Sequence, residues 1–300
     1  MTTSLSERVL AGDRAALARL LTRIENDDAI GQQALDAIYP HTGRAHLIGI
    51  TGPPGGGKST LVNEMIRAYR QRGAKVAVIA VDPSSPITGG ATLGDRIRMQ
   101  EWHADDGVFI RSMASRQFGG GLAQNTLSVA HAFDAAGYDP VIIETVGTGQ
   151  DEVAIASLAM TTLLIQVPGT GDGVQALKAG SLEIGDILVV TKGDRPEASQ
   201  LARDLRSLAQ IGIAAGVETP GWQPPVVRTS AVRGDGIGDL VAQVDRHAAW
   251  LRESGAWEER ARAIVSTEIS ARVHAALMKR PATTSREDGD IAALAHQVTA

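Results

Sequence analysis

The sequence of 300 residues contains no cysteine, and aromatic residues make up only 3% of it. Without cysteine the chain can form neither a disulfide framework nor a Cys-ligated metal or cluster site. With so few aromatics, the core must rest on Leu, Ile, Val and Ala, which suit strands buried on both faces of a parallel sheet. A chain of this length can bury a large core, so it needs no covalent staples.

Positive charge and long apolar runs are also lacking. The formal net charge is −5, which argues against a nucleic-acid-binding surface, since such surfaces carry a basic balance. No apolar run approaches the roughly 20 residues of a membrane-spanning helix, and the first residues have no apolar signal-peptide core. We therefore expect a cytoplasmic protein that binds neither nucleic acid nor membrane.

Apolar strands alternate with amphipathic helices through the middle of the chain. This alternation predicts an α/β fold with a mostly parallel central sheet that helices cover on both faces. We expect a helical N-terminal extension (1–44), a nucleotide-binding domain (45–254) and a C-terminal helical arm with a tail (255–300). The expected strands are 46–51, 76–81, 109–113, 141–146, 163–167, 187–191 and 226–230. The expected helices between and after them are 59–72, 122–136, 174–183, 196–209, 237–254 and 256–279.

The motif G-x-x-x-x-G-K-[ST] is present in full between Gly52 and Ser59. It follows an apolar strand and opens a helix, which is the context of a phosphate-binding P-loop rather than of a chance glycine turn. Lys58 would place its charge on the β- and γ-phosphates, the Ser59 hydroxyl would bind Mg²⁺, and the helix start adds partial positive charge. The residues predicted to line the phosphates are Gly52, Pro54, Gly55, Gly56, Gly57, Lys58, Ser59 and Thr60.

A second motif, Thr191-Lys192-Gly193-Asp194, resembles the [NT]-K-x-D signature that reads guanine. The carboxylate of Asp194 would accept two hydrogen bonds from guanine, and adenine lacks that pair of donors. The stem of Lys192 would pack along the base. Ser230 and Ala231 follow the next strand and resemble the loop that backs the guanine. Taken alone, the motif also fits a solvated loop after a strand, but its place behind a P-loop favours guanine.

Acidic residues follow two of the apolar strands, where ligands of an open α/β sheet bind. Asp82 and Glu144 end strands, and Asp95 lies in the glycine-rich loop 84–98, which has the character of a switch region. With Ser59 these three acids are predicted to hold Mg²⁺ directly or through water, and with Lys58 to support catalysis. A cap or turn role is the alternative for Asp82 and Asp95. Gly147 can offer its N–H to the γ-phosphate, and Gln150 is a candidate for orienting the attacking water.

Together these segments resemble the MeaB/ArgK family of P-loop GTPases. The most specific matches are V-D-P-S-S-P-I-T-G-G at 81–90, L-G-D-R-I-R-M at 93–99 and E-T-V-G-T-G-Q at 144–150. The resemblance implies a SIMIBI-class fold, a homodimer with a C-terminal dimerisation arm, and bound GTP or GDP with Mg²⁺. It also implies a partner: an adenosylcobalamin-dependent acyl-CoA mutase such as methylmalonyl-CoA mutase, whose cofactor loading the GTPase gates and which it protects.

The chain departs from the family pattern at two places. Thr191 stands where Asn is common, and Asp172-Gly173-Val174-Gln175 stands where Asp-Glu-Leu-Gln is common. Two other functions stay open at this point: an ATP-dependent kinase of the ArgK type, and a metallochaperone GTPase that delivers nickel. The guanine motif argues against the kinase, and the lack of cysteine and of His clusters argues against the metallochaperone.

Overall fold

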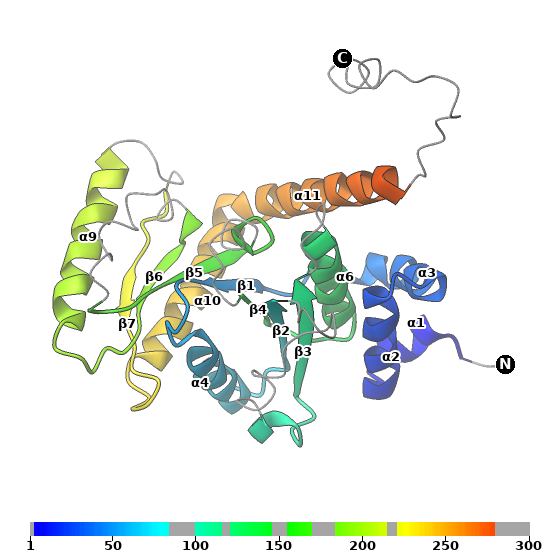
Figure 1. Cartoon of the computed structure of the whole chain (residues 1–300), viewed down its shortest axis with the longest axis horizontal. Coiled ribbons are helices and arrows are strands. Elements are labelled where there is room, and N and C mark those ends of the chain that lie inside the picture. Colours follow the sequence, from blue (N-terminus) through cyan, green and yellow to red (C-terminus); the bar gives the residue numbers. More distant parts are fainter. Residues whose placement is uncertain are drawn as a thin grey trace, which may run out of the picture.

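A computed structural model describes residues 3–83, 100–115, 121–145, 155–169, 184–214 and 221–279, with the backbone alone at the ends of some of these segments. Within them seven strands form one sheet in the order β3-β2-β4-β1-β5-β6-β7, and every neighbouring pair is parallel (Figure 1). The strands are β1 (Leu47–Thr51), β2 (Val76–Pro83), β3 (Val108–Ser115), β4 (Val141–Thr145), β5 (Thr161–Gln166), β6 (Ile187–Val190) and β7 (Val226–Arg228).

The α/β fold predicted from the sequence is confirmed, and the sheet is parallel throughout the described strands. Each predicted strand lies within two residues of its observed bounds. The helix expected over 196–209 runs further, as α9 (Ala198–Ala214). The helix expected over 174–183 lies outside the described residues.

Helices α4 (Lys58–Gln71) and α10 (Ile237–Ser254) cover one face of the sheet (Figure 1). Their inner side chains, among them Leu61, Met65 and Val244, are fully buried against strand residues such as Ile48 and Ile165. The amphipathic spacing in the sequence is what allows this packing, because one stripe of each helix is apolar and faces the strands.

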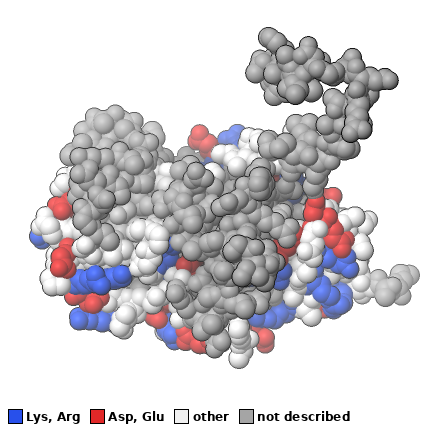
Figure 2. Space-filling view, in the orientation of Figure 1, with Lys and Arg blue, Asp and Glu red and all other residues white. Residues whose placement is uncertain are grey.

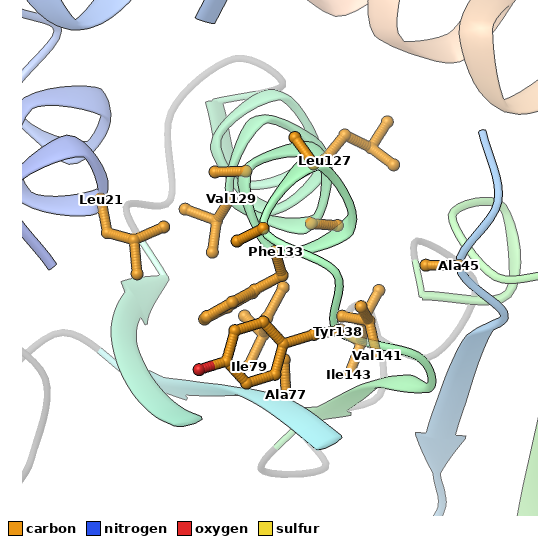
Figure 3. Packing of buried hydrophobic residues seen from close by; sticks show 14 of the residues in the cluster. Leu21, Ala45, Ala77, Ile79, Leu127, Val129, Phe133, Tyr138, Val141 and Ile143 are labelled. Carbon is orange, nitrogen blue, oxygen red and sulfur yellow. The ribbon is translucent and has the colours of Figure 1, made fainter. Parts of the chain in front are cut away.

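The other face carries α6 (Gly121–Ala135) and, beside β6 and β7, α9. Although aromatics are scarce, Phe133 of α6 and Tyr138 lie together in the core between α6 and the sheet (Figure 3). The ring of Phe133 meets Phe109 and Tyr138 edge to face, with centroids 5.3 Å and 5.6 Å away. Such pairs add to the burial energy of the rings, so these three rings stabilise the packing of α6 on the sheet.

The N-terminal helices α1 (Leu5–Leu10), α2 (Arg14–Glu25) and α3 (Ala29–Ile38) pack on the outer side of α6. Each begins at a side-chain cap: Ser4 accepts from the backbone N–H of Glu7, Asp13 from Ala16 and Asp28 from Ile30. Such caps satisfy helix-end N–H groups that would otherwise lack partners. The helices share one apolar core with α6 and the sheet.

The long helix α11 (Ala256–Lys279) follows α10 directly and crosses α6 (Figure 1). Trp257 and Ile264 enter the same core as the N-terminal helices, whereas Ile269 and Val273 are 56% and 53% exposed. Across the part of the chain that is described, no helix is long and apolar enough to cross a membrane. Where described residues are visible in Figure 2, acidic and basic side chains are interspersed.

Candidate nucleotide-binding site

The carboxyl ends of four parallel strands bring the predicted site residues to one rim of the sheet. The P-loop follows β1, Glu144 lies in β4, and the Thr191–Asp194 motif follows β6. Ser230 lies two residues after the end of β7. In an open α/β sheet ligands bind at this rim. Segments as far apart in the sequence as Gly52 and Ser230 therefore form one candidate site.

The P-loop has the backbone geometry that its glycines permit. Gly52 has a φ of 143°, and a Cβ at this position would lie 2.6 Å from the Ile165 carbonyl oxygen. No other residue fits there, because both the conformation and the space exclude a side chain. Gly57, with a φ of 85°, is the N-cap of α4, and the helix begins at Lys58. The predicted helix N-terminus therefore points its free N–H groups at the loop.

Lys58 lies over the loop that precedes it. Its Nζ donates hydrogen bonds to the carbonyl oxygens of Gly52, at 2.8 Å, and Pro53, at 3.1 Å, and the residue is only 5% exposed. These two hydrogen bonds offset part of the cost of burying the polar end of the side chain. The lysine thus stands where a phosphate cradled by the loop would meet it.

Ser59 of α4 and Glu144 of β4 are joined by a hydrogen bond. The Ser59 hydroxyl donates a hydrogen bond of 2.7 Å to Glu144 Oε1, and both residues are buried. Glu144 stands level with Ile50 of β1, one residue before β1 ends. A buried carboxylate in an apolar strand is costly unless a hydrogen bond or a cation compensates it. A hydroxyl and a carboxylate in contact are the hard oxygen donors that Mg²⁺ prefers.

The guanine-type motif is tied to its neighbouring loop. Ser230 Oγ donates to Asp194 Oδ1 at 2.8 Å, and the backbone N–H of Gly193 donates to the Thr229 carbonyl oxygen at 2.8 Å. The Ser230 hydrogen bond, more than any other cause, lowers the pKa of Asp194 below its ordinary value. Asp194 is exposed at the rim, so an ionised carboxylate stands ready to accept hydrogen bonds from a base.

The same motif contacts the P-loop. Thr191 Oγ1 donates to the Gly56 carbonyl oxygen at 2.7 Å, and Lys192 Nζ donates to the Gly55 carbonyl oxygen at 3.0 Å. Lys192 adopts a left-handed backbone conformation with a φ of 51°. Thr191 is 5% exposed, so a threonine in the place of asparagine still supplies a buried hydrogen bond between the phosphate loop and the base loop.

Several predicted positions lie wholly or partly outside the described residues. Asp82 is the next-to-last residue of β2, at the same rim, but its side chain is not described; Asp95, Gly147 and Gln150 lie outside altogether. No group of three His, Cys, Asp or Glu that could hold a metal occurs among the residues whose side chains are described. Of the four predicted Mg²⁺ ligands, Ser59 and Glu144 are thus the pair that the structure brings together.

The structure also describes three other predicted site residues. Pro54 and Thr60 are exposed at the P-loop and the first turn of α4, and Ala231 follows Ser230 in a turn. One participant was not predicted: the Gln166 carbonyl oxygen, at the end of β5, accepts from the backbone N–H of Thr191 at 3.0 Å and lies 3.3 Å from the Thr191 hydroxyl, whose hydrogen it shares with the closer Gly56 carbonyl oxygen. No sequence pattern marks it, because the contact uses only the main chain.

Comparisons with known proteins agree with this geometry. A Pyrococcus horikoshii protein named as a GTPase is 45% identical over 287 residues, which cover 96% of this chain and 90% of its own. GTPase ArgK of Escherichia coli is 38% identical over 239 residues, or 78% of this chain and 72% of its own. The solved structure of an LAO/AO transport system kinase superposes with a TM-score of 0.75 at 29% identity, covering 91% of this chain and 83% of that one.

A family model described as "Methylmalonyl Co-A mutase-associated GTPase MeaB" matches residues 17–286. The match includes the P-loop, the Thr191–Asp194 motif and all seven strands. The chain belongs to the MeaB family of methylmalonyl-CoA mutase-associated GTPases, and it is a GTPase that binds GTP and GDP.

Proposed function

We propose that this GTPase is a Mg²⁺-dependent chaperone of an adenosylcobalamin-dependent acyl-CoA mutase, whose cofactor loading it gates and which it protects from inactivation. The family's association with methylmalonyl-CoA mutase supports this partner. The observation that carries the proposal is the meeting of Lys58, the Ser59–Glu144 pair and the Asp194–Ser230 pair at one rim of the sheet.

Each of these groups has a defined task in the proposed reaction. Lys58 stabilises the charge that develops on the transferred phosphoryl group. Ser59 and Glu144 would hold Mg²⁺, which would supply positive charge against the phosphates. Asp194 accepts from the two guanine donors, and Ser230 holds that carboxylate in place. Asp82, Asp95 and Gly147 are assigned to the Mg²⁺ and the γ-phosphate from their sequence positions.

Guanine selectivity separates this proposal from the kinase alternative, which the name of the superposed transport system kinase suggests for that protein. Titration with Mg²⁺ should show GDP binding far more tightly than ADP. Adenine cannot make the two hydrogen bonds that guanine donates to the carboxylate, and their loss costs several kcal/mol, or roughly 100-fold or more in affinity. Equal affinities for the two nucleotides would favour the kinase.

The chaperone role is tested by coupling. Purified apo methylmalonyl-CoA mutase is added to the GTPase, and GTP turnover and adenosylcobalamin transfer to the mutase are measured together. We expect the mutase to change the turnover rate, and the Lys58→Ala variant to abolish both turnover and gated transfer. Lys75→Ala, an exposed lysine just before β2, is the matched control. If the mutase does not change GTP turnover and GTP does not change adenosylcobalamin transfer, the chaperone role is overturned, whereas the GTPase activity is not.

We also propose that two copies associate through α11. The exposed Ile269 and Val273 give this helix an apolar outer face, which a second copy would cover. Sedimentation equilibrium should report a dimer, and the double variant Ile269→Glu, Val273→Glu should report a monomer with the GTPase rate retained.

A further inference from the structure

A hollow of about 740 Å³ opens at the rim of the sheet opposite to the nucleotide site. It lies between the last turns of α9, the segment leading into β7 and the last turns of α10, and the side chains that matter in it are Arg206, Trp222, Pro225, Arg246, Trp250 and Glu253. Pro225 immediately precedes β7 and its carbonyl oxygen accepts from the N–H of Leu188 near the start of β6. The hollow therefore sits at the amino ends of strands whose carboxyl ends carry the guanine-type motif.

Two guanidinium groups reach this hollow without a carboxylate partner. Arg206 and Arg246 are exposed, and among the described residues neither makes an ion pair. Some other surface arginines do form ion pairs: Arg67 pairs with Glu101 and Arg72 with Asp245. Glu253 is the one acid among the lining residues, so the lining carries two positive charges and one negative, a net +1. The whole chain carries −5, so positive charge here runs against its overall balance.

Aromatic side chains form the floor beside these charges. The indoles of Trp222 and Trp250 are in contact, with centroids 5.5 Å apart, and Arg246 lies over the Trp222 ring at 5.7 Å. Trp222 is buried, whereas Trp250 is partly open to the hollow. Because the two indoles already touch, a planar ligand ring has to stack on the open part of Trp250 rather than enter between them. A guanidinium close to an aromatic platform suits a ring that carries an anion.

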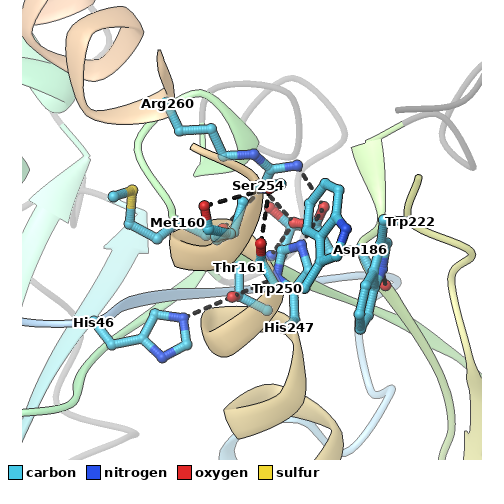
Figure 4. Close-up of polar contacts among 11 residues, drawn as sticks. His46, Met160, Thr161, Asp186, Trp222, His247, Trp250, Ser254 and Arg260 are labelled. Atoms are coloured by element: carbon cyan, nitrogen blue, oxygen red, sulfur yellow. Dashed lines mark hydrogen bonds and ion pairs between the residues drawn. The ribbon is translucent and has the colours of Figure 1, made fainter. Parts of the chain in front are cut away.

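A buried polar cluster fixes the platform from behind (Figure 4). Trp222 Nε1 donates to the Asp186 carbonyl oxygen at 2.9 Å, and Trp250 stacks on His247 with 17° between the rings. Arg260 of α11 donates to both carboxylate oxygens of Asp186, at 2.6 Å and 2.8 Å. Rings held in this way lose little freedom when a ligand binds, and such pre-organisation raises affinity.

We propose that this hollow, here called the Trp250 pocket, binds a small molecule that joins a planar ring to an anionic group. Its volume falls within the range of small-molecule sites, about 300–1,000 Å³. The ring stacks on Trp250, and Arg206 and Arg246 receive the phosphate or carboxylate. The site is separate from the GTP site, and it does not depend on the mutase as partner.

Ligand binding is tested on the full chain saturated with GDP and Mg²⁺, so that the P-loop is occupied. Adenosine 5′-monophosphate supplies a ring with a phosphate and indole-3-acetate a ring with a carboxylate; each is titrated by calorimetry and by tryptophan fluorescence. We expect at least one to bind, and the one that binds identifies the anion. Adenosine lacks the anion and ribose 5-phosphate lacks the ring. Each should bind at least about tenfold more weakly than adenosine 5′-monophosphate, because each loses one of the two kinds of contact.

Two arginine variants locate the site. Arg206→Gln and Arg246→Gln should each weaken the anionic probe about tenfold and leave adenosine binding unchanged. Arg203→Gln, on the same helix as Arg206, is the matched control and should bind like the parent; unchanged GTP turnover and melting temperature show that each variant is folded. Three results would overturn the proposal. Neither ring-bearing anion binds, or added GDP displaces a bound probe, or both arginine variants bind the anionic probe as tightly as the parent.

Discussion

Ser59 Oγ and Glu144 Oε1 lie 2.7 Å apart, which joins the first turn of α4 to β4 across 85 positions of sequence. The contact places a hydroxyl and a carboxylate together at the mouth of the P-loop. Ser59 and Glu144 are the two residues of the proposed Mg²⁺ site whose side chains the structure describes.

Glu144→Gln keeps the size of the side chain and its ability to accept from Ser59, but removes its charge. We expect the Mg²⁺ concentration that gives half-maximal GTP turnover to rise about tenfold or more, because residues that hold or orient a metal typically contribute 10- to 100-fold. Steady-state turnover over a Mg²⁺ series measures this. Glu101→Gln, an exposed acid bonded to Asn63 and Arg67, should leave the midpoint unchanged; an unchanged midpoint in Glu144→Gln would remove this residue from the Mg²⁺ site.

Asp194→Asn should exchange the base preference of the site. The asparagine amide offers a donor where the carboxylate offers an acceptor, so it no longer matches the two donors of guanine but suits xanthine, which carries an oxygen in place of the exocyclic amine. We expect GDP affinity to fall about 100-fold or more and affinity for xanthosine diphosphate to rise. Fluorescence competition with both nucleotides measures the exchange. A GDP affinity within a few-fold of the parent would contradict the assignment of Asp194.

Thr191→Val removes the hydroxyl that bonds to the Gly56 carbonyl oxygen and keeps the shape of the side chain. One neutral hydrogen bond is worth about 1 kcal/mol, so GDP should dissociate about fivefold faster. Thr191→Ser keeps the hydroxyl and is the control, with a dissociation rate close to that of the parent. Stopped-flow release of a fluorescent GDP analogue distinguishes them, and equal rates in the two variants would mean that the contact does not stabilise the bound state.

Arg260→Gln should lower the stability of the whole fold. It leaves Asp186, whose side chain is 8% exposed, as a buried carboxylate without its guanidinium. Breaking a buried pair in this way costs about 3–5 kcal/mol, which corresponds to a fall in melting temperature of roughly 5–15 °C. Arg262→Gln, an exposed neighbour on α11 that bonds to its own helix, should melt within a degree or two of the parent. Similar losses in both variants would show that Asp186 does not need Arg260.

Stability should fall as the pH drops from about 6.5 towards 4. Burial lowers the pKa of His46 to about 3 and that of His247 to about 4, from 6.5 in each case. Below pH 6.5 the unfolded chain takes up protons at both imidazoles while the folded chain keeps them neutral, so protons favour unfolding. At pH 5 this amounts to about 2 kcal/mol for each histidine.

Urea unfolding at pH 7 and pH 5 measures this loss. His247→Gln should remove about half of it, because one of the two titrating groups is gone. His103→Gln replaces an exposed histidine and should retain the full dependence. A free energy of unfolding that is equal at the two pH values would contradict the neutral, buried state of the pair.

The two histidines share one hydroxyl. Thr161 Oγ1 lies 2.6 Å from His46 Nε2 and 2.8 Å from His247 Nδ1 (Figure 4). The hydroxyl has a single hydrogen, so it can donate to only one of the two imidazoles. A ring that accepts this hydrogen is unprotonated at that nitrogen and therefore neutral, which agrees with the direction of both pKa shifts.

The sequence by itself determined the α/β class, the order of the strands and helices along the chain, and the prediction of a GTP-binding site. These features are local: a strand of Leu, Ile and Val such as Ile187–Val190, or a glycine loop before Lys58, has the same meaning wherever the chain folds. The same holds for the prediction of guanine, which rests on the short motif that ends at Asp194. Family membership followed from those local blocks.

Tertiary structure alone decided which residues meet across the sheet. The contacts of Thr191 with Gly56, of Ser230 with Asp194 and of Arg260 with Asp186 depend on strand order and helix packing. So does the Trp250 pocket, whose lining comes from three separate segments. The motifs of the sequence do not say which of their atoms meet, and main-chain acceptors such as the Gly56 carbonyl exist at every position. Only the folded geometry selects among them, because a hydrogen bond or a stacked ring depends on distance in space rather than on spacing along the chain.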